Sequence, residues 1–195
     1  MTRWKHEDWL NGYYEILMDF DDPYAWIEAA QTLWSQPQLL GVWTSQEFDA
    51  DSDPRLDASD VLVACELMTG HLNGVARLPN GKTAPCGSGI SQTENWLVFF
   101  LPLAGLGRCY ELGRFPFGDA GRPWVFEVDQ WMVSLATAVF RKVPFRVAAV
   151  GSELHTLDMI SQAGAGVPER RPCGLLAPAC QDLQWFPPTF KPEAT

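Results

Sequence analysis

Five aspartates in one short segment form the pattern with the most definite chemistry in this sequence. They are Asp49, Asp51, Asp53, Asp57 and Asp60. Their spacing matches positions 1, 3, 5, 9 and 12 of a calcium loop of the EF-hand kind, where carboxylate oxygens collect a hard cation. Position 6 is Pro54 where the sharp turn of such a loop needs glycine, and position 12 is an aspartate instead of the longer glutamate. We therefore keep calcium as an alternative and predict no bound metal or other cofactor.

The same segment has a second interpretation as a contact surface for a basic protein. Opposite charges steer two proteins together, and exposed aromatic residues add binding energy at interfaces. The predicted contact residues are Glu47, Asp49, Asp51, Asp53, Asp57, Asp60 and, just before them, Trp43. A solvated acidic loop without a partner is the plain alternative for these residues.

The excess negative charge of the chain lies entirely in its first third. Of the net charge of −10 over 195 residues, residues 1–60 carry thirteen acids against three bases, and residues 61–195 carry eleven of each. Nucleic acids are bound by clustered Lys and Arg that release counterions from the phosphates, and this sequence has no such cluster. We expect no nucleic-acid binding, and the acidic third favours a basic protein as partner.

Side chains for nucleophilic catalysis are present without a recognisable signature. Cys86 lies beside glycines, and His71 or His155 could act as its base. Neither a GxSxG elbow nor a nucleotide-binding glycine loop occurs. Cys173 and Cys180 are spaced too widely for a usual zinc site. The sequence leaves enzyme activity open and favours a protein that is not an enzyme.

The apolar spacing predicts three helices. Residues 5–20 show large apolar side chains at intervals of three and four, which is typical of an amphipathic helix. Asp22 and Pro23 are suited to begin a second helix ending near Ser35, and the two helices would form an antiparallel hairpin. A third helix is predicted over 127–141, before Pro144.

The strands are predicted between and after these helices. Residues 61–68 and 145–150 have strand composition, and 74–85 read as a hairpin that turns at Asn80-Gly81. The uninterrupted apolar run 96–101 is expected at the centre of the sheet. It flanks the third helix together with 145–150, so these two strands could pair in parallel.

These elements predict an α+β fold in one domain over 1–195. We expect a mainly antiparallel or mixed sheet of four to six strands, with the N-terminal helical hairpin and the long helix packed on it. The domain would consist of the hairpin in 1–36, the sheet and helix in 61–150, and an extended, proline-rich tail in 164–195.

The leading hypothesis for function is a small, soluble, acidic module that binds a basic protein, as a neutralising partner of the immunity or inhibitor kind. The alternative is an enzyme or small-ligand binder with a pocket between the sheet and the Gly- and Pro-rich segment 102–124. No membrane segment and no secretory signal are recognisable, and five cysteines without a CxxC motif suit a reducing compartment, so the predicted location is the cytoplasm.

Overall fold

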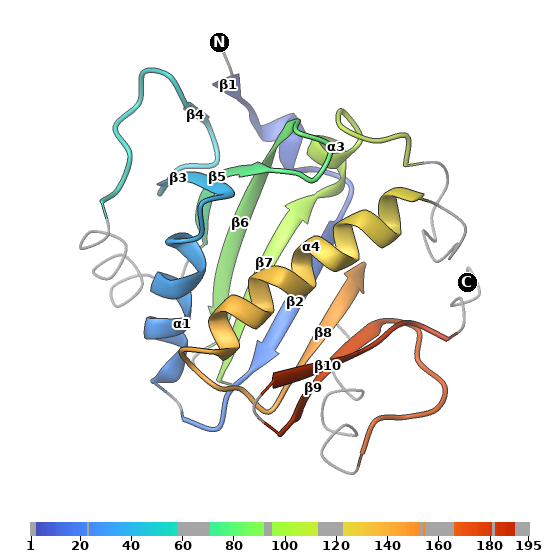
Figure 1. The fold of residues 1–195 in the computed structure, drawn as a ribbon. Coiled ribbons are helices and arrows are strands. Elements are labelled where there is room, and N and C mark those ends of the chain that lie inside the picture. Colours follow the sequence, from blue (N-terminus) through green and yellow to red (C-terminus); the bar gives the residue numbers. More distant parts are fainter. Residues whose placement is uncertain are drawn as a thin grey trace.

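The computed structural model describes residues 3–22, 24–57, 71–91, 95–112, 123–152, 154, 166–180 and 182–189. Its main feature is a sheet of eight strands, with helices on one face (Figure 1). The strands of this sheet are β2 (Tyr13–Asp19), β3 (Leu39–Trp43), β5 (Leu72–Arg77), β6 (Thr83–Ser91), β7 (Trp96–Pro102), β8 (Val147–Ser152), β9 (Gly174–Ala179) and β10 (Asp182–Phe186). Two short strands, β1 (Arg3–Trp4) and β4 (Phe48–Asp49), pair separately. The helices are η1 (His6–Trp9), α1 (Ala25–Trp34), α3 (Leu103–Leu106) and α4 (Pro123–Phe140).

The eight strands follow the order β10-β9-β8-β2-β7-β6-β5-β3, and every neighbouring pair is antiparallel. The prediction of four to six strands was therefore too low, and the molecule is mostly β. Strands β7 and β8 do not pair with each other, because β2 lies between them. The chain passes from β7 to β8 through α4, which crosses the sheet in front of β2 in Figure 1.

The predicted N-terminal helical hairpin is wrong. Residues 13–19 form β2, a central strand, and the first α-helix is α1. Both faces of β2 are buried, so its apolar residues do not alternate with exposed ones. Before β2, Asn11 and Gly12 both have positive φ, at 73° and 83°, a conformation that no α-helix can continue through.

The other two helices are confirmed. Helix α1 matches the predicted second helix, and Asp22 supports its start by accepting a hydrogen bond from the Tyr24 amide at 2.9 Å. Helix α4 begins at Pro123, four residues before the predicted start, and ends at Phe140. Proline suits the first turn of a helix because its missing N–H would have had no partner there.

Several strand predictions are also confirmed. Strand β7 is buried in the sheet between β2 and β6. Strands β5 and β6 form the predicted hairpin, closed by a hydrogen bond from the Leu78 amide to the Lys82 carbonyl, with Gly81 at a φ of 81°. Strand β8 lies two residues beyond its predicted range. The predicted strand 61–68 falls outside the described residues.

The segment predicted as an extended tail is instead folded into the sheet. Strands β9 and β10 form a hairpin on its β8 side, and Trp185 packs against the main core. Gly174 has no side chain, so the Trp185 ring can lie directly against its backbone. A Cβ at Gly174 would lie only 1.8 Å from that ring. The many prolines led to the prediction of an extended tail. Pro178 nevertheless lies in β9, opposite Leu183, because the edge of a sheet tolerates proline.

The core lies on both faces of the sheet. On one face, α1 and α4 cover side chains from the central strands, among them Ile16, Met18, Phe99 and Leu101. On the other face, a cluster of Trp4, Trp9, Trp43, Phe48, Val75 and Phe100 forms beneath the N-terminal segment and β4. This second cluster, which we call the tryptophan cluster, attaches the acidic segment to the sheet.

Candidate functional site

The acidic segment, residues 47–57, contains β4 and the closed turn that follows it. The Asp49 amide donates to Asp53 Oδ2 at 2.7 Å, and the Asp51 amide donates to Asp49 Oδ1 at 3.0 Å. The Asp53 amide in turn donates to the Asp49 carbonyl at 2.9 Å. Aspartate side chains commonly close turns in this way. The spacing that resembles a calcium loop thus serves the backbone of the turn.

This geometry bears on the calcium alternative. Within the residues that the structure describes, no group of three or more His, Cys, Asp or Glu side chains is placed to hold a metal ion. Asp60, the last ligand of the predicted loop, lies outside those residues. One oxygen each of Asp49 and Asp53 is engaged by a backbone amide instead of converging on a cation.

The carboxylates of the segment are largely presented to solvent. Glu47, Asp51, Asp53 and Asp57 are exposed, and Asp49 is half-buried. The single base in the segment, Arg55, donates to two backbone carbonyls, those of Leu40 at 2.9 Å and Ala50 at 3.4 Å. The segment therefore carries a concentrated negative charge on its outer surface.

Trp43 lies beneath this segment instead of on the surface. Its side chain is 4% exposed, stacks on Phe48 with ring centroids 4.2 Å apart, and donates from Nε1 to the Asp53 carbonyl at 3.3 Å. The Arg55 guanidinium lies 5.6 Å from its ring. Trp43 thus holds the acidic turn on the tryptophan cluster, and its predicted role in contacting a partner stays a prediction.

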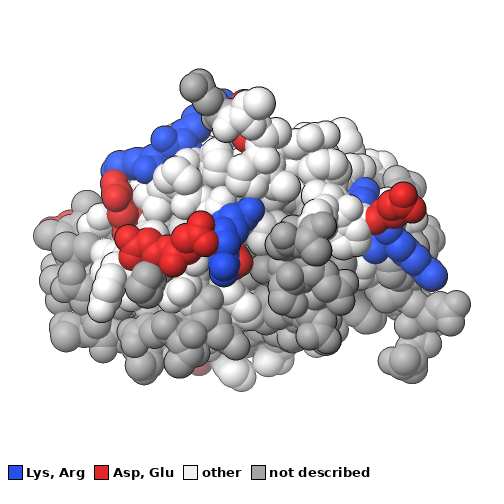
Figure 2. Space-filling view, turned by 90° about the horizontal axis from the view of Figure 1, so that it is seen from below, with Lys and Arg blue, Asp and Glu red and all other residues white. Residues whose placement is uncertain are grey.

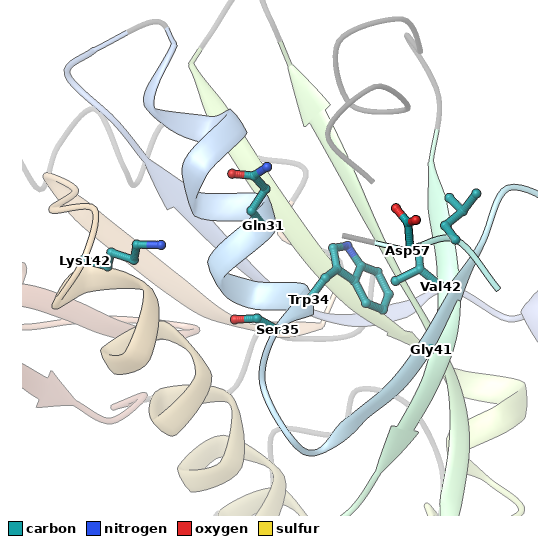
Figure 3. A pocket seen from close by; sticks show the side chains of 8 residues that line it. Gln31, Trp34, Ser35, Gly41, Val42, Asp57 and Lys142 are labelled. Carbon is teal, nitrogen blue, oxygen red and sulfur yellow. The ribbon is translucent and has the colours of Figure 1, made fainter. Parts of the chain in front are cut away.

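A cavity of about 400 Å³ opens beside the acidic segment. Its lining comes from α1, β3, the end of the acidic segment and the residues after α4: Gln31, Trp34, Ser35, Gly41, Val42, Leu56, Asp57 and Lys142. Figure 3 shows the Trp34 indole reaching from α1 toward β3, with the Asp57 carboxylate on the β3 side. This volume is within the range, on the order of 300 to 1,000 Å³, of sites that hold small molecules.

The position of Trp34 in the cavity is fixed from several sides. Its Nε1 donates to Ser88 Oγ at 2.9 Å, and its ring makes an edge contact with Phe99. The ring also packs against the backbone of Gly74, where a Cβ would lie 2.6 Å from it. The cavity is therefore lined by an aromatic ring whose position is held by a hydrogen bond and by packing.

No family model matches this chain, and neither the curated proteins nor the solved structures contain a match. None of the helices in the described residues is long and apolar enough to cross a membrane.

The structure separates the proposed nucleophile from its candidate base. Cys86 is fully buried on the helix-covered face of the sheet, and burial raises the pKa of its thiol well above the usual value. His71 lies over Gly89 and meets the edge of Phe100, which belongs to the opposite face. Positions 86 and 89 of β6 face opposite sides of the sheet, because successive residues of a strand alternate between its two faces. Cys86 is therefore on one side of the sheet, and His71, which lies over Gly89, is on the other. His155 lies outside the described residues.

The segment predicted to border a pocket is partly in contact with the sheet. Helix α3 packs on β6 so closely that a Cβ at Gly105 would lie 2.4 Å from the Pro85 ring. Residues 113–122 are outside the described part of the chain. The enzyme or ligand-binding alternative at 102–124 therefore stays a prediction, and the cavity described above is in a different place.

The sequence analysis missed a buried ionisable pair beneath α4. The Tyr14 hydroxyl donates to Asp129 Oδ1 at 2.5 Å, and both side chains are buried. Burial raises the pKa of Asp129 to about 7, although the Tyr14 hydrogen bond acts in the opposite direction. The pKa of Tyr14 is also raised, first by burial and then by Asp129. The sequence offered one sign of this pair: Asp129 follows Val128 directly, among the apolar residues of the predicted third helix.

Charges around the C-terminal end of α4 are arranged differently. Among the described residues here, four ion pairs join residues that are far apart in sequence: Arg146 with Asp19 at 2.7 Å and with Asp21 at 3.3 Å, Lys142 with Glu28 at 3.7 Å, and Arg141 with Asp182 at 4.0 Å. Figure 2 shows this end, where acidic and basic side chains lie next to one another. We call it the paired end. Its charges largely neutralise one another.

Proposed function

We propose that this protein is a small acidic module that binds a basic protein through the acidic segment. The observation that carries the proposal is the arrangement of charge in that segment: four exposed carboxylates surround a turn whose single base donates to backbone carbonyls. Such a surface attracts a cationic partner and accelerates its association.

The attachment of the segment also supports this function. The turn is closed by its own hydrogen bonds and held by Trp43 and Phe48, so its carboxylates are positioned before a partner arrives. A preorganised surface loses less conformational entropy on binding than a flexible one. The partner would be neutralised by occlusion of its basic surface, as an immunity protein or inhibitor acts on its target.

The proposed location is the cytoplasm. All four cysteines that the structure describes, Cys86, Cys109, Cys173 and Cys180, are free thiols. Proteins in oxidising compartments commonly carry disulfides, whereas thiols persist where glutathione and thioredoxin keep them reduced. A basic partner in the same compartment is what the proposal requires.

The test is capture of a partner from native lysate by the tagged chain at low and at high salt. We expect a basic protein to be retained at low salt and released at high salt, because exposed charges are screened. A variant with Glu47, Asp51 and Asp57 changed to Lys should capture none of it, while its thermal melt stays cooperative. Capture by this variant equal to that of the wild type would contradict the proposal.

A further inference from the structure

The cavity beside the acidic segment is lined by groups suited to one kind of basic side chain. We propose that it receives an arginine side chain of the basic partner, with the guanidinium near Asp57. This inference rests on the proposed function, because the arginine is supplied by the protein that the acidic segment attracts. It adds a specific anchor to a surface that would otherwise distinguish partners by charge alone.

The walls favour arginine over lysine. Trp34, Val42 and Leu56 supply aromatic and apolar surface to the cavity. A guanidinium is weakly hydrated and packs well on aromatic and apolar groups, whereas an ammonium is compact and strongly hydrated. Entry into a cavity with such walls therefore costs less desolvation for arginine.

The polar lining offers hydrogen-bond acceptors for a planar donor group. Asp57 contributes a carboxylate, and Gln31 contributes an amide oxygen. The Ser35 hydroxyl donates its hydrogen to the Thr32 carbonyl at 2.8 Å, which leaves its oxygen as an acceptor. Guanidinium presents five N–H donors in a fixed fork, so it can use several acceptors at once.

The one base in the lining does not oppose this assignment. Lys142 Nζ lies 3.7 Å from Glu28 Oε1, so a carboxylate offsets its charge. In Figure 3, Lys142 and Asp57 lie on opposite sides of Trp34. The end of the cavity formed by Asp57 is continuous with the acidic segment. A cationic side chain guided by that segment would reach the Asp57 end first.

The experiment compares two peptides of equal charge, acetylated tetra-arginine amide and tetra-lysine amide, by titration calorimetry at low salt. We expect the wild type to bind the arginine peptide about tenfold more tightly, the effect of one charge-assisted hydrogen-bonding pair in a partly desolvated site. In Asp57→Asn the preference should fall below about twofold, because the amide cannot form that pair.

Glu47→Gln is the matched control, because it removes the same charge from the same segment outside the cavity lining. It should weaken both peptides by the same small factor and keep the preference for arginine. Equal binding of the two peptides by the wild type, or an equal preference in both variants, would overturn the cavity assignment and leave the proposed function standing. Failure of the wild type to bind either peptide would overturn both.

Discussion

The acidic segment and the paired end show two different uses of charge within one small protein. At the paired end, each base lies within 4.0 Å of a carboxylate from a distant part of the chain, and the pairs join β2, α1 and β10 to the residues between α4 and β8. In the acidic segment, the carboxylates of Asp49 and Asp53 instead close the turn of their own segment, and most of the acids of the segment are exposed. Charge at the paired end thus joins distant parts of the fold, whereas the proposed function assigns the charge of the acidic segment to a partner.

The difference follows from what lies beneath each region. Asp19 and Arg146 join a buried strand to the start of its neighbour, and their backbones are also hydrogen-bonded at 2.8 Å. The acidic segment sits on aromatic rings, which need no charge to hold it. We therefore expect the charge of its exposed acids to contribute little to the stability of the fold.

The largest effect on stability is expected for Trp43→Ala. Removing a buried Trp side chain commonly lowers the free energy of unfolding by about 3 to 5 kcal/mol. The variant would also lose the hydrogen bond to Asp53 and the stacking on Phe48, so the acidic turn would loosen. Urea unfolding measures the first effect, and faster proteolysis at 47–57 measures the second. Wild-type stability would show that the tryptophan cluster does not anchor the segment.

The second prediction concerns the paired end. Arg146→Met should lower the free energy of unfolding by about 2 to 3 kcal/mol, because it leaves the nearly buried Asp19 carboxylate without its charged donor. Arg141→Met is the control: both members of its ion pair are more than 60% exposed, and such pairs contribute at most about 1 kcal/mol. Equal effects of the two variants would mean that this end does not depend on ion pairing with buried acids.

A smaller effect, visible as a pH dependence, is expected from the buried pair beneath α4. Folding raises the pKa of Asp129 from 3.8 to about 7, so the folded state binds the proton more tightly than the unfolded state. The stability from this group is fully present below the ordinary pKa and is lost as the pH rises through about 7, by roughly 2 kcal/mol above pH 5.

Asp129→Asn removes this titration and keeps an oxygen that can accept the Tyr14 hydroxyl. The fall in melting temperature between about pH 5 and about pH 8 should therefore be smaller in the variant than in the wild type. Parallel curves for the two proteins would show that Asp129 titrates near its ordinary pKa.

The smallest effect is expected for Glu47→Gln in the acidic segment. An exposed side chain away from packing changes the free energy of unfolding by less than about 0.5 kcal/mol. Chemical denaturation of the wild type and this variant should give curves that overlap within that margin. A loss above about 1 kcal/mol would mean that the acids of the segment hold the fold together, contrary to the comparison.

The sequence allowed the helices over the sheet and the β5–β6 hairpin to be predicted, because their local patterns agree with their surroundings. It misled at β2, where Glu15 and Asp19 break the apolar run of a strand buried on both faces. Glu15 is buried there because it accepts a hydrogen bond from the Leu154 amide, a partner 139 residues away that no local pattern reveals. Asn11-Gly12 was a readable turn signal that the helical spacing of the aromatic residues obscured.

The candidate site was predictable only in part, for the same reason. Clustering of the acids is visible in the sequence, so the segment could be named as a candidate without the structure. The burial of Trp43 depends on Phe48 and on strand pairing with β1, and the cavity needs four separate elements to meet. Long-range packing of this kind determines which acidic residue lines a cavity and which does not.

The most direct test compares two charge reversals of equal size, one in each region. The segment variant changes Glu47, Asp51 and Asp57 to Lys, and the control changes Asp21, Glu28 and Asp182 to Lys at the paired end. After thermal melts confirm that both fold, each is used to capture basic proteins from native lysate at low salt. Our account predicts that the control retains the partner and the segment variant loses it. Equal capture by both variants would contradict a partner-binding role for the acidic segment.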